Sequence, residues 1–201
     1  NLKDSKDFDI FVLYPPETLQ TEFVEEGLTL GKQVFKGNFW EKAYSQHPYI
    51  RGIIDGYKIE VVPAYDIPDL KNMISAVDRT PHHQKYMQEN LKGSQKDEVR
   101  LLKYFLRKIN CYGSDAQYEG FAGYLCELLV IYYKDFLGVL QAASNWSLPV
   151  KLAVVGEQHQ LLDDYHDPLV VIDPVDDHRN VGAAVAKTTI SRFIIAARQF
   201  L

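Results

Sequence analysis

The chain has 201 residues, of which 46% are hydrophobic and 24% charged, with a formal net charge of −5 at pH 7. This balance is that of a folded globular protein, and the two cysteines, Cys111 and Cys126, are too few for a disulfide framework. No apolar run approaches the roughly 18 residues that a membrane-spanning helix needs, so we expect no membrane contact and a cytoplasmic protein with reduced thiols.

The first half of the chain alternates short apolar segments with one amphipathic segment, which is typical of an α/β unit. Residues 10–14 read as a buried strand, and residues 18–35 as an amphipathic helix. Three later segments, rich in β-branched and aromatic residues, read as strands: 40–45, 49–54 and 57–62. The last strand is expected to end at Pro63, and Asp55-Gly56 between the last two strands predicts a tight hairpin turn.

Helical periodicity dominates the second half. We expect a helix that Ser94 caps and Gly113 ends, one long helix over residues 120–144, and a last helix over residues 187–200. A short strand over residues 169–172 interrupts them. The predicted fold class is therefore α+β, with a mixed-sheet domain over residues 1–86 and a mainly helical domain over residues 87–201.

Two aspartates stand at the head of the first strand, in Asp7-Phe8-Asp9. Alternate residues of a strand point to one face, so both carboxylates project together. Glu60 lies in another strand and is a candidate third carboxylate. Hard oxygen ligands suit Mg²⁺, and three carboxylates of this kind hold two metal ions in enzymes that transfer nucleotidyl groups. Taken alone, an aspartate pair at a strand end is more often simple solvation of that end than a metal site.

A local basic stretch contrasts with the acidic chain as a whole. Its six members lie within 17 consecutive residues: Lys92, Lys96, Arg100, Lys103, Arg107 and Lys108. We expect Lys103 to lie off the apolar stripe of its helix, on the side of the neighbouring arginines. Such a stretch can contact nucleic-acid phosphates, or it can be an ordinary solvated helix face.

Several short motifs follow one another along the chain: Asp7-Phe8-Asp9-Ile10-Phe11, Gln46-His47-Pro48-Tyr49, Ser75-Ala76-Val77-Asp78-Arg79-Thr80-Pro81-His82-His83, Asp97-Glu98-Val99-Arg100-Leu101-Leu102-Lys103, Gly120-Phe121-Ala122-Gly123-Tyr124-Leu125, Asp173-Pro174-Val175-Asp176 and Arg179-Asn180-Val181. Their order and content resemble the class I, archaeal-type CCA-adding enzymes, which are tRNA nucleotidyltransferases. The resemblance covers nearly the whole chain, and it implies a nucleotidyltransferase palm domain followed by a helical central domain, with the nucleotide between them.

The resemblance also implies roles for individual residues. Asp7, Asp9 and Glu60 would be catalytic and would hold Mg²⁺. Four residues would bind the incoming nucleotide: His83, Lys103, Tyr112 and Arg179. The implied reaction adds C, C and A from CTP and ATP to the 3′ end of tRNA without a nucleic-acid template, and a homodimer is one arrangement open to the full-length enzyme.

Each nucleotide-binding role has a structural alternative in the sequence. Lys103 could only solvate its helix, Tyr112 could be a packing residue, and Arg179 could pair with Asp176 or Asp177. The neighbouring His82 and His83 suggest a surface turn more than a metal site, because adjacent side chains diverge.

The chain departs from the family pattern at its start. Relatives carry a Gly-Ser turn ahead of the first strand, and we expect this turn to be missing, which would leave the fragment inactive. Two other functions stay open. One is a poly(A) polymerase-like or oligoadenylate synthetase-like nucleotidyltransferase, and the other is an inactive fragment that only binds nucleotide or RNA.

Overall fold

The computed structural model describes residues 7–115 and 117–201, and the chain divides into two compact units. The first unit ends at Gln84 and the second spans Lys85–Leu201. Each unit combines helices with a sheet, which confirms the α+β class. The expected absence of a turn ahead of the first strand falls outside the described residues. None of the helices in the described ranges is long and apolar enough to cross a membrane.

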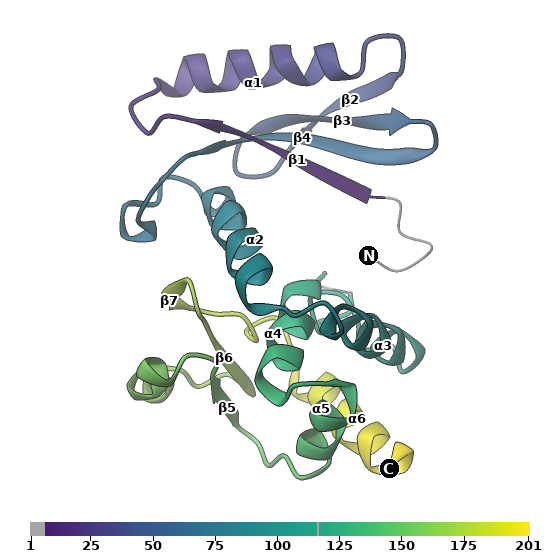
Figure 1. Ribbon diagram of the computed structural model, residues 1–201. Helices are drawn as coiled ribbons and strands as arrows, with labels where there is room; N and C mark the ends of the chain where they lie inside the picture. The colour runs from purple at the N-terminus through teal and green to yellow at the C-terminus, as the bar shows by residue number, and fades with distance from the viewer. Residues whose placement is uncertain (1–6, 116) are drawn as a thin grey trace. The chain divides into compact units, whose positions relative to one another are not determined.

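The first unit is a four-stranded sheet with one helix on one face (Figure 1). Its elements are β1 (Asp7–Tyr14), α1 (Gln20–Val34), β2 (Phe39–Tyr44), β3 (Pro48–Ile54) and β4 (Tyr57–Tyr65). The strand order is β1-β4-β3-β2, with β1 parallel to β4 and the other pairs antiparallel. Helix α1 covers the face that carries Ile50 and Val61, so Asp9 and Glu60 lie on the other face.

Helix α1 packs unusually close to the sheet because small residues face it. A Cβ atom at Gly27 would lie 2.8 Å from Cγ of Pro63, and one at Gly31 would lie 2.7 Å from Cβ of Ile50. Phe35 and Ile50 are fully buried in the core beneath the helix. The glycines therefore set the distance between helix and sheet, since any larger side chain there would collide with the strands.

The predicted hairpin is confirmed, but the predicted end of its second strand is wrong. Asp55 and Gly56 have φ angles of 52° and 78°, as a two-residue hairpin turn with the twist of the strands requires. Strand β4 continues through Pro63 to Tyr65. Pairing with β3 ends at Val61, so Pro63 lies where β4 pairs with β1 alone. A proline is tolerated in a strand at such a one-sided position.

A buried aspartate fastens the chain after the sheet. Two short 3₁₀ turns, η1 (Leu70–Asn72) and η2 (Ala76–Asp78), lead into α2 (Arg79–Asn90). The Asp78 carboxylate is fully buried and accepts hydrogen bonds from three backbone N–H groups, at 2.9 Å from Tyr65, 2.6 Å from Ser75 and 3.2 Å from Ile74. It therefore ties the end of β4 to the start of α2.

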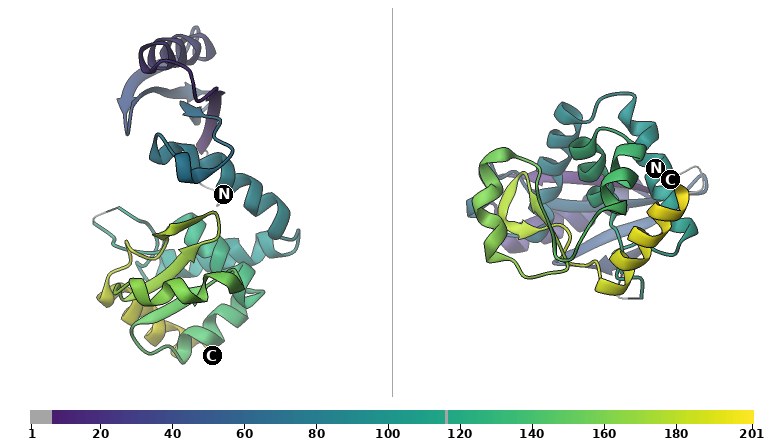
Figure 2. Two further views of the ribbon diagram at one scale, coloured as in Figure 1. Left: turned by 90° about the vertical axis from the view of Figure 1, so that its left-hand side faces the viewer. Right: turned by 90° about the horizontal axis from the view of Figure 1, so that it is seen from below.

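The second unit packs helices and a three-stranded sheet around one core. Its elements are α3 (Gln95–Lys108), α4 (Gly123–Tyr133), α5 (Phe136–Ser144), β5 (Val150–Ala153), η3 (Gly156–Asp164), β6 (Leu169–Asp173), β7 (Asp176–Asn180) and α6 (Lys187–Phe200). The central strand β6 is parallel to β5 and antiparallel to β7. All residues of β6 are buried, because the helices and η3 lie on opposite sides of the sheet (Figure 2).

The single helix predicted over residues 120–144 is wrong, since α4 and α5 are separate helices. Lys134 adopts a left-handed φ of 79°, and the Asp135 carboxylate caps α5 by accepting a 2.7 Å hydrogen bond from the N–H of Gly138. The apolar periodicity continues across this break, which is why periodicity alone missed it.

The predicted ends of α3 also need correction. Ser94 stands at the N-terminus, but its side chain makes no capping hydrogen bond. The helix ends before Asn110, whose φ is 53°, with bonds from Asn110 N–H to the Arg107 carbonyl and from Cys111 N–H to the Leu106 carbonyl. This is a Schellman motif in which asparagine takes the place usual for glycine. Gly113 therefore lies in the following loop.

Candidate functional site

The open face of the first sheet carries a row of four charged residues, one from each strand. The strand register places Asp9 opposite Glu60, Glu60 opposite Arg51, and Arg51 opposite Glu41. Arg51 forms an ion pair with Glu41 at 2.6 Å. Asp7 lies two residues before Asp9 on the same strand and therefore on the same face.

The carboxylates of this row affect one another electrostatically. Asp9 is exposed as a residue, yet partial desolvation of its carboxyl group, and then the charge of Asp7, raise its pKa. Desolvation and the charge of Asp9 also raise the pKa of Glu60, while Arg51 and a 3.4 Å hydrogen bond from the Tyr49 hydroxyl act in the opposite direction. The raised pKa values indicate that desolvation and the repulsion between carboxylates dominate at Asp9, and that they outweigh the nearby Arg51 at Glu60.

Carboxylate oxygens on two adjacent strands are the ligands that a hard divalent cation prefers. In residues 7–115 and 117–201, however, no three His, Cys, Asp or Glu side chains are close enough together to hold a metal ion. The oxygen donors therefore fit Mg²⁺ in their chemistry. The described side chains do not, however, bring three carboxylates close enough together to coordinate one ion.

Lys103 is not a solvated lysine on the exposed side of its helix. It is buried with Val99, Leu102 and Leu106, and its Nζ lies 2.8 Å from Oε1 of Glu127 on α4. Burial by itself lowers the pKa of Lys103, but the Glu127 carboxylate outweighs burial, so the pKa is raised. The expectation that Lys103 lies off the apolar stripe is therefore wrong, because α3 packs this side against α4.

Lys103 and Tyr112 meet at the first turn of α4. A Cβ atom at Gly123 would lie 3.4 Å from Nζ of Lys103 and 3.5 Å from the hydroxyl oxygen of Tyr112. The residue before the helix, Ala122, offers no side-chain cap to the first N–H groups. An ammonium group, a hydroxyl group and an uncapped helix N-terminus without a side chain in the way form a suitable site for phosphate.

The two adjacent histidines both lie on α2. The Nε2 of His82 lies 2.7 Å from the carbonyl oxygen of Ile67, so this ring fixes α2 to the preceding loop. His83 is partly buried on the same helix and belongs to the first unit, which ends at Gln84. The structure thus places His83 in a different unit from Lys103, Tyr112 and Arg179.

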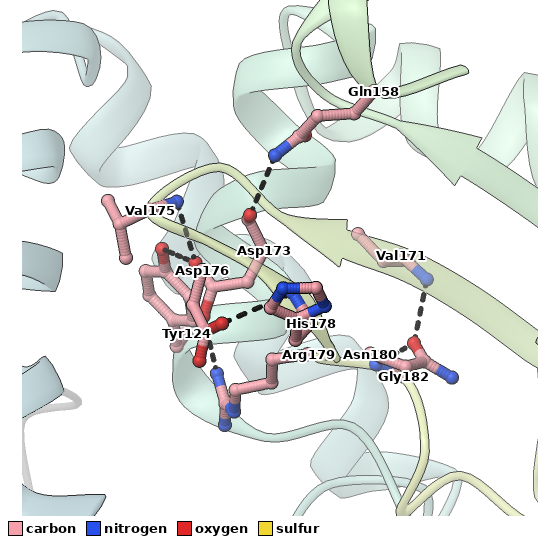
Figure 3. Close-up of polar contacts among 10 residues, drawn as sticks. All are labelled: Tyr124, Gln158, Val171, Asp173, Val175, Asp176, His178, Arg179, Asn180 and Gly182. Carbon is pink, nitrogen blue, oxygen red and sulfur yellow. Dashed lines mark hydrogen bonds and ion pairs between the residues drawn. The ribbon is translucent and has the colours of Figure 1, made fainter. Parts of the chain in front are cut away.

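Arg179 pairs with Asp173, whereas the sequence suggested Asp176 or Asp177 as its partner. Its Nη1 lies 2.8 Å from Oδ2 of Asp173, which is fully buried at the end of β6 (Figure 3). In the pairing of β6 with β7, Ile172 faces Asn180 and Asp173 faces Asp176, so residues 177–179 form a bulge. A regular antiparallel ladder through Ile172 and Asn180 would place Arg179 opposite Asp173, and the guanidinium still reaches that carboxylate although the bulge breaks the backbone pairing.

The next residue, Asn180, is the last of β7 and fixes the end of the bulge to β6. Its Oδ1 accepts 2.8 Å hydrogen bonds from the N–H groups of Val171 and Gly182. Its Nδ2 donates 2.9 Å hydrogen bonds to Asp167 and to the carbonyl of Leu169. All of its polar capacity is therefore used to fix β7 beside β6.

Four residues at these sites received no individual role from the sequence: Gly123, Tyr124, Glu127 and Asp173. Lys103, Tyr112 and Glu127 together are called the Lys103 cluster. Tyr124 donates a 3.1 Å hydrogen bond from its hydroxyl to Asp173, so the first turn of α4 touches both this cluster and the pair of Arg179 with Asp173. Gly123 and Glu127 are four residues apart, and this helical spacing could have indicated a shared face.

Solved structures with a similar arrangement include a cytoplasmic RNA terminal U-transferase and the Cid1 poly(U) polymerase. The chain superposes on a cytoplasmic RNA terminal U-transferase with a TM-score of 0.62 and 15% identity, covering 96% of this chain and 75% of the other. For the Cid1 poly(U) polymerase the TM-score is 0.61 at 16% identity, covering 96% of this chain and 76% of the other. At such low identity these similarities establish the nucleotidyltransferase fold and no more.

Curated relatives are much closer in sequence. The chain is 41% identical to a CCA-adding enzyme of Methanocaldococcus jannaschii and 44% identical to one of Methanothermobacter thermautotrophicus, in both cases over all of this chain. It spans 47% and 44% of the lengths of these two relatives, about half of each. The resemblance predicted from the motifs is thereby confirmed.

The helical second unit carries the family's own signature. Residues 97–201 match the model of the tRNA nucleotidyltransferase second domain. This range includes the Lys103 cluster, the first turn of α4 and the pair of Asp173 with Arg179. Over half of the chain matches this one domain, and the chain therefore belongs to the tRNA nucleotidyltransferase family.

Proposed function

We propose that this chain is the catalytic part of a cytoplasmic enzyme that adds CCA to the 3′ end of tRNA from CTP and ATP. The observation that carries the proposal is the convergence of Lys103 and Tyr112 on the uncapped first turn of α4, within a chain 41–44% identical to CCA-adding enzymes. These groups bind the triphosphate of the incoming nucleotide through the ammonium charge, the hydroxyl and the backbone N–H groups. A homodimer of the full-length enzyme remains a prediction.

The first unit contributes the acidic groups. Asp7, Asp9 and Glu60 would hold Mg²⁺, which supplies activation of the tRNA 3′-hydroxyl and charge stabilisation of the departing pyrophosphate when it is bound. The raised pKa values of Asp9 and Glu60 support this assignment, since carboxylates that repel one another gain most from a cation. In the second unit, Arg179 contacts the nucleobase, and His83 in the first unit donates to a phosphate oxygen.

Calorimetric titration of the chain with CTP and with ATP tests this function. We expect both nucleotides to bind in the presence of Mg²⁺ and to bind more weakly in EDTA. Binding of ATP without CTP would favour the poly(A) polymerase-like or oligoadenylate synthetase-like alternative. A chain that binds neither nucleotide would contradict the nucleotide site at α4.

Replacing Asp9 by asparagine should raise the Tm of the metal-free chain and remove its response to Mg²⁺. The first effect follows from the loss of repulsion with Asp7 and Glu60, and the second from the loss of a ligand. Wild type should gain about 5 °C in Tm at a Mg²⁺ concentration ten times the Kd. Glu41→Gln, on the same face but paired with Arg51, should keep the Mg²⁺ response. An Asp9→Asn chain that Mg²⁺ stabilises as well as wild type would rule out Asp9 as a ligand.

A further inference from the structure

The Asp173-Pro174-Val175-Asp176 motif has no role in the function proposed above, yet it contains the most deeply buried carboxylate of the second unit's polar network. Asp173 has no exposed surface. Its Oδ1 accepts hydrogen bonds from the Tyr124 hydroxyl at 3.1 Å and from the Val175 N–H at 3.2 Å, and its Oδ2 accepts one from Arg179 at 2.8 Å. Figure 3 shows this carboxylate between the tyrosine and the arginine.

The backbone around Asp173 is also fixed. Gln158 on η3 donates from Nε2 to the Asp173 carbonyl at 2.9 Å and to Oδ1 of Asp177 at 2.6 Å. The amide of Gln158 thereby spans the bulge between β6 and β7. The Asp173 carboxylate thus sits on a rigid backbone, so any group that it holds is held in one place.

Arg179 is held on one side only. Among the described residues its guanidinium makes one ion pair, through Nη1, and its side chain is 35% exposed. A guanidinium has five N–H donors in a planar fork and no acceptor. Asp173 therefore holds one end of the fork while part of its donor edge remains accessible to a ligand.

We propose that Asp173 and Tyr124 are positioning residues, which hold the Arg179 guanidinium in one orientation and thereby set which nucleobase the site accepts. The inference rests on the proposed function, in which Arg179 contacts the base. Tyr124 matters because its hydroxyl occupies the second oxygen of the carboxylate. Without that hydrogen bond only the 3.2 Å bond from the Val175 N–H holds this oxygen, so the carboxylate gains freedom to turn and the arginine turns with it.

Base chemistry explains why orientation would decide selectivity. Cytosine and adenine each present an acceptor ring nitrogen on the pairing edge, whereas uracil and guanine present an N–H donor at the same place. A fixed fork of donors satisfies the first pair and opposes the second. Sites that leave a buried donor unpaired reject the wrong ligand strongly, whereas a mobile arginine can turn to the carbonyl groups of uracil or guanine.

The test compares Tyr124→Phe with wild type in calorimetric titrations of CTP, ATP, UTP and GTP, each with Mg²⁺, and of inorganic tripolyphosphate. We expect the preference for CTP over UTP to fall about tenfold, as expected for loss of one orienting hydrogen bond. Affinity for tripolyphosphate should stay within about twofold of wild type, because the Lys103 cluster is intact. Asp173→Asn, which keeps the size but loses the charge, should reduce the same preference further.

Two controls distinguish an effect on the orientation of Arg179 from a general effect on folding. Tyr133→Phe removes a hydroxyl from the same helix, one that accepts a 3.3 Å hydrogen bond from Trp146, and should leave the CTP to UTP ratio unchanged. In an Arg179→Lys background, adding Tyr124→Phe should change the ratio no further, because the tyrosine acts through the arginine. A purely structural role would lower Tm and leave every affinity ratio as it is.

The outcomes distinguish the two proposals. A wild-type chain that prefers CTP and ATP, combined with a Tyr124→Phe chain that keeps the same ratios, would overturn the positioning role and leave the proposed function standing. A folded wild-type chain that binds none of the four nucleotides would overturn the proposed function, and this inference with it.

Discussion

Replacing Asp78 by alanine should lower the free energy of unfolding of the first unit by about 3 kcal/mol or more. The carboxylate is fully buried and is the acceptor for the N–H groups of Tyr65, Ile74 and Ser75. Alanine leaves these donors without their acceptor, and each unsatisfied buried donor costs about 1–3 kcal/mol. The loss of stability should therefore rank among the largest that removal of a single polar side chain causes in this unit.

Urea unfolding followed by tryptophan fluorescence measures this effect unit by unit. The chain has two tryptophans, Trp40 in β2 of the first unit and Trp146, which is partly buried against the core of the second. In a Trp146→Phe background, the fluorescence reports on the first unit. Asp69→Ala is the matched control, since Asp69 is exposed and caps one N–H at 3.0 Å, and it should cost about 1 kcal/mol or less. Equal midpoints for the Asp78 and Asp69 variants would contradict the role given to Asp78.

Removing the carboxylate of Glu127 should destabilise the second unit by about 3 kcal/mol, because Lys103 is left buried without its partner. The two charged groups are 2.8 Å apart, with the side chains of Lys103 and Glu127 only 10% and 26% exposed. Glu127→Gln keeps the size of the side chain and removes only its negative charge. Fluorescence of Trp146 in a Trp40→Phe background follows the unfolding of this unit.

The same variant should reverse the pH dependence of stability in alkaline solution. In wild type the pKa of Lys103 is raised above its ordinary value of 10.5, so the pair's contribution is complete at neutral pH and is lost as the pH rises through the raised pKa. In Glu127→Gln burial lowers the pKa, so the unfolded chain binds more protons than the folded one and stability rises with pH up to about 10.5. Parallel stability curves for the two proteins would refute this account.

A double variant provides the complementary control. Lys103→Met with Glu127→Leu replaces the pair by apolar groups of similar volume and should recover most of the stability that Glu127→Gln loses. It should bind nucleotide far more weakly than wild type, because the ammonium group is gone. Recovery of stability without recovery of binding would separate the structural role of the pair from its proposed role toward phosphate.

Local signals in the sequence predicted local structure well. Asp55-Gly56 gave the hairpin, and the apolar spacing after Lys187 gave α6 (Lys187–Phe200) with the expected bounds. These features depend on neighbours in the chain, so the sequence contains nearly all the information that determines them. The alternation in Asp7-Phe8-Asp9 likewise predicted two carboxylates on one face, and the register of β1 with β4 adds Glu60 beside them.

The features that the sequence did not predict depend on contacts between distant segments or on strands made of polar residues. Lys103 looks solvated until α4 packs against α3 and brings Glu127 to it. Strand β7, Asp176–Asn180, is entirely polar and has no β-propensity, so only its pairing with β6 makes it a strand. For the same reason, the partner of Arg179 could not be chosen correctly among four nearby aspartates.

The bulge between β6 and β7 places a constraint on chain length that its sequence does not reveal. Asp177 and His178 are exposed, and surface segments of this kind usually accept insertions and deletions. Here Asn180 fixes one end of the segment and Asp173 fixes the other. We therefore expect His178 to vary freely in residue type among relatives, and Asp177 to keep an acceptor for Gln158. The number of residues should stay fixed, since one residue more or fewer would carry Arg179 away from the carboxylate that orients it.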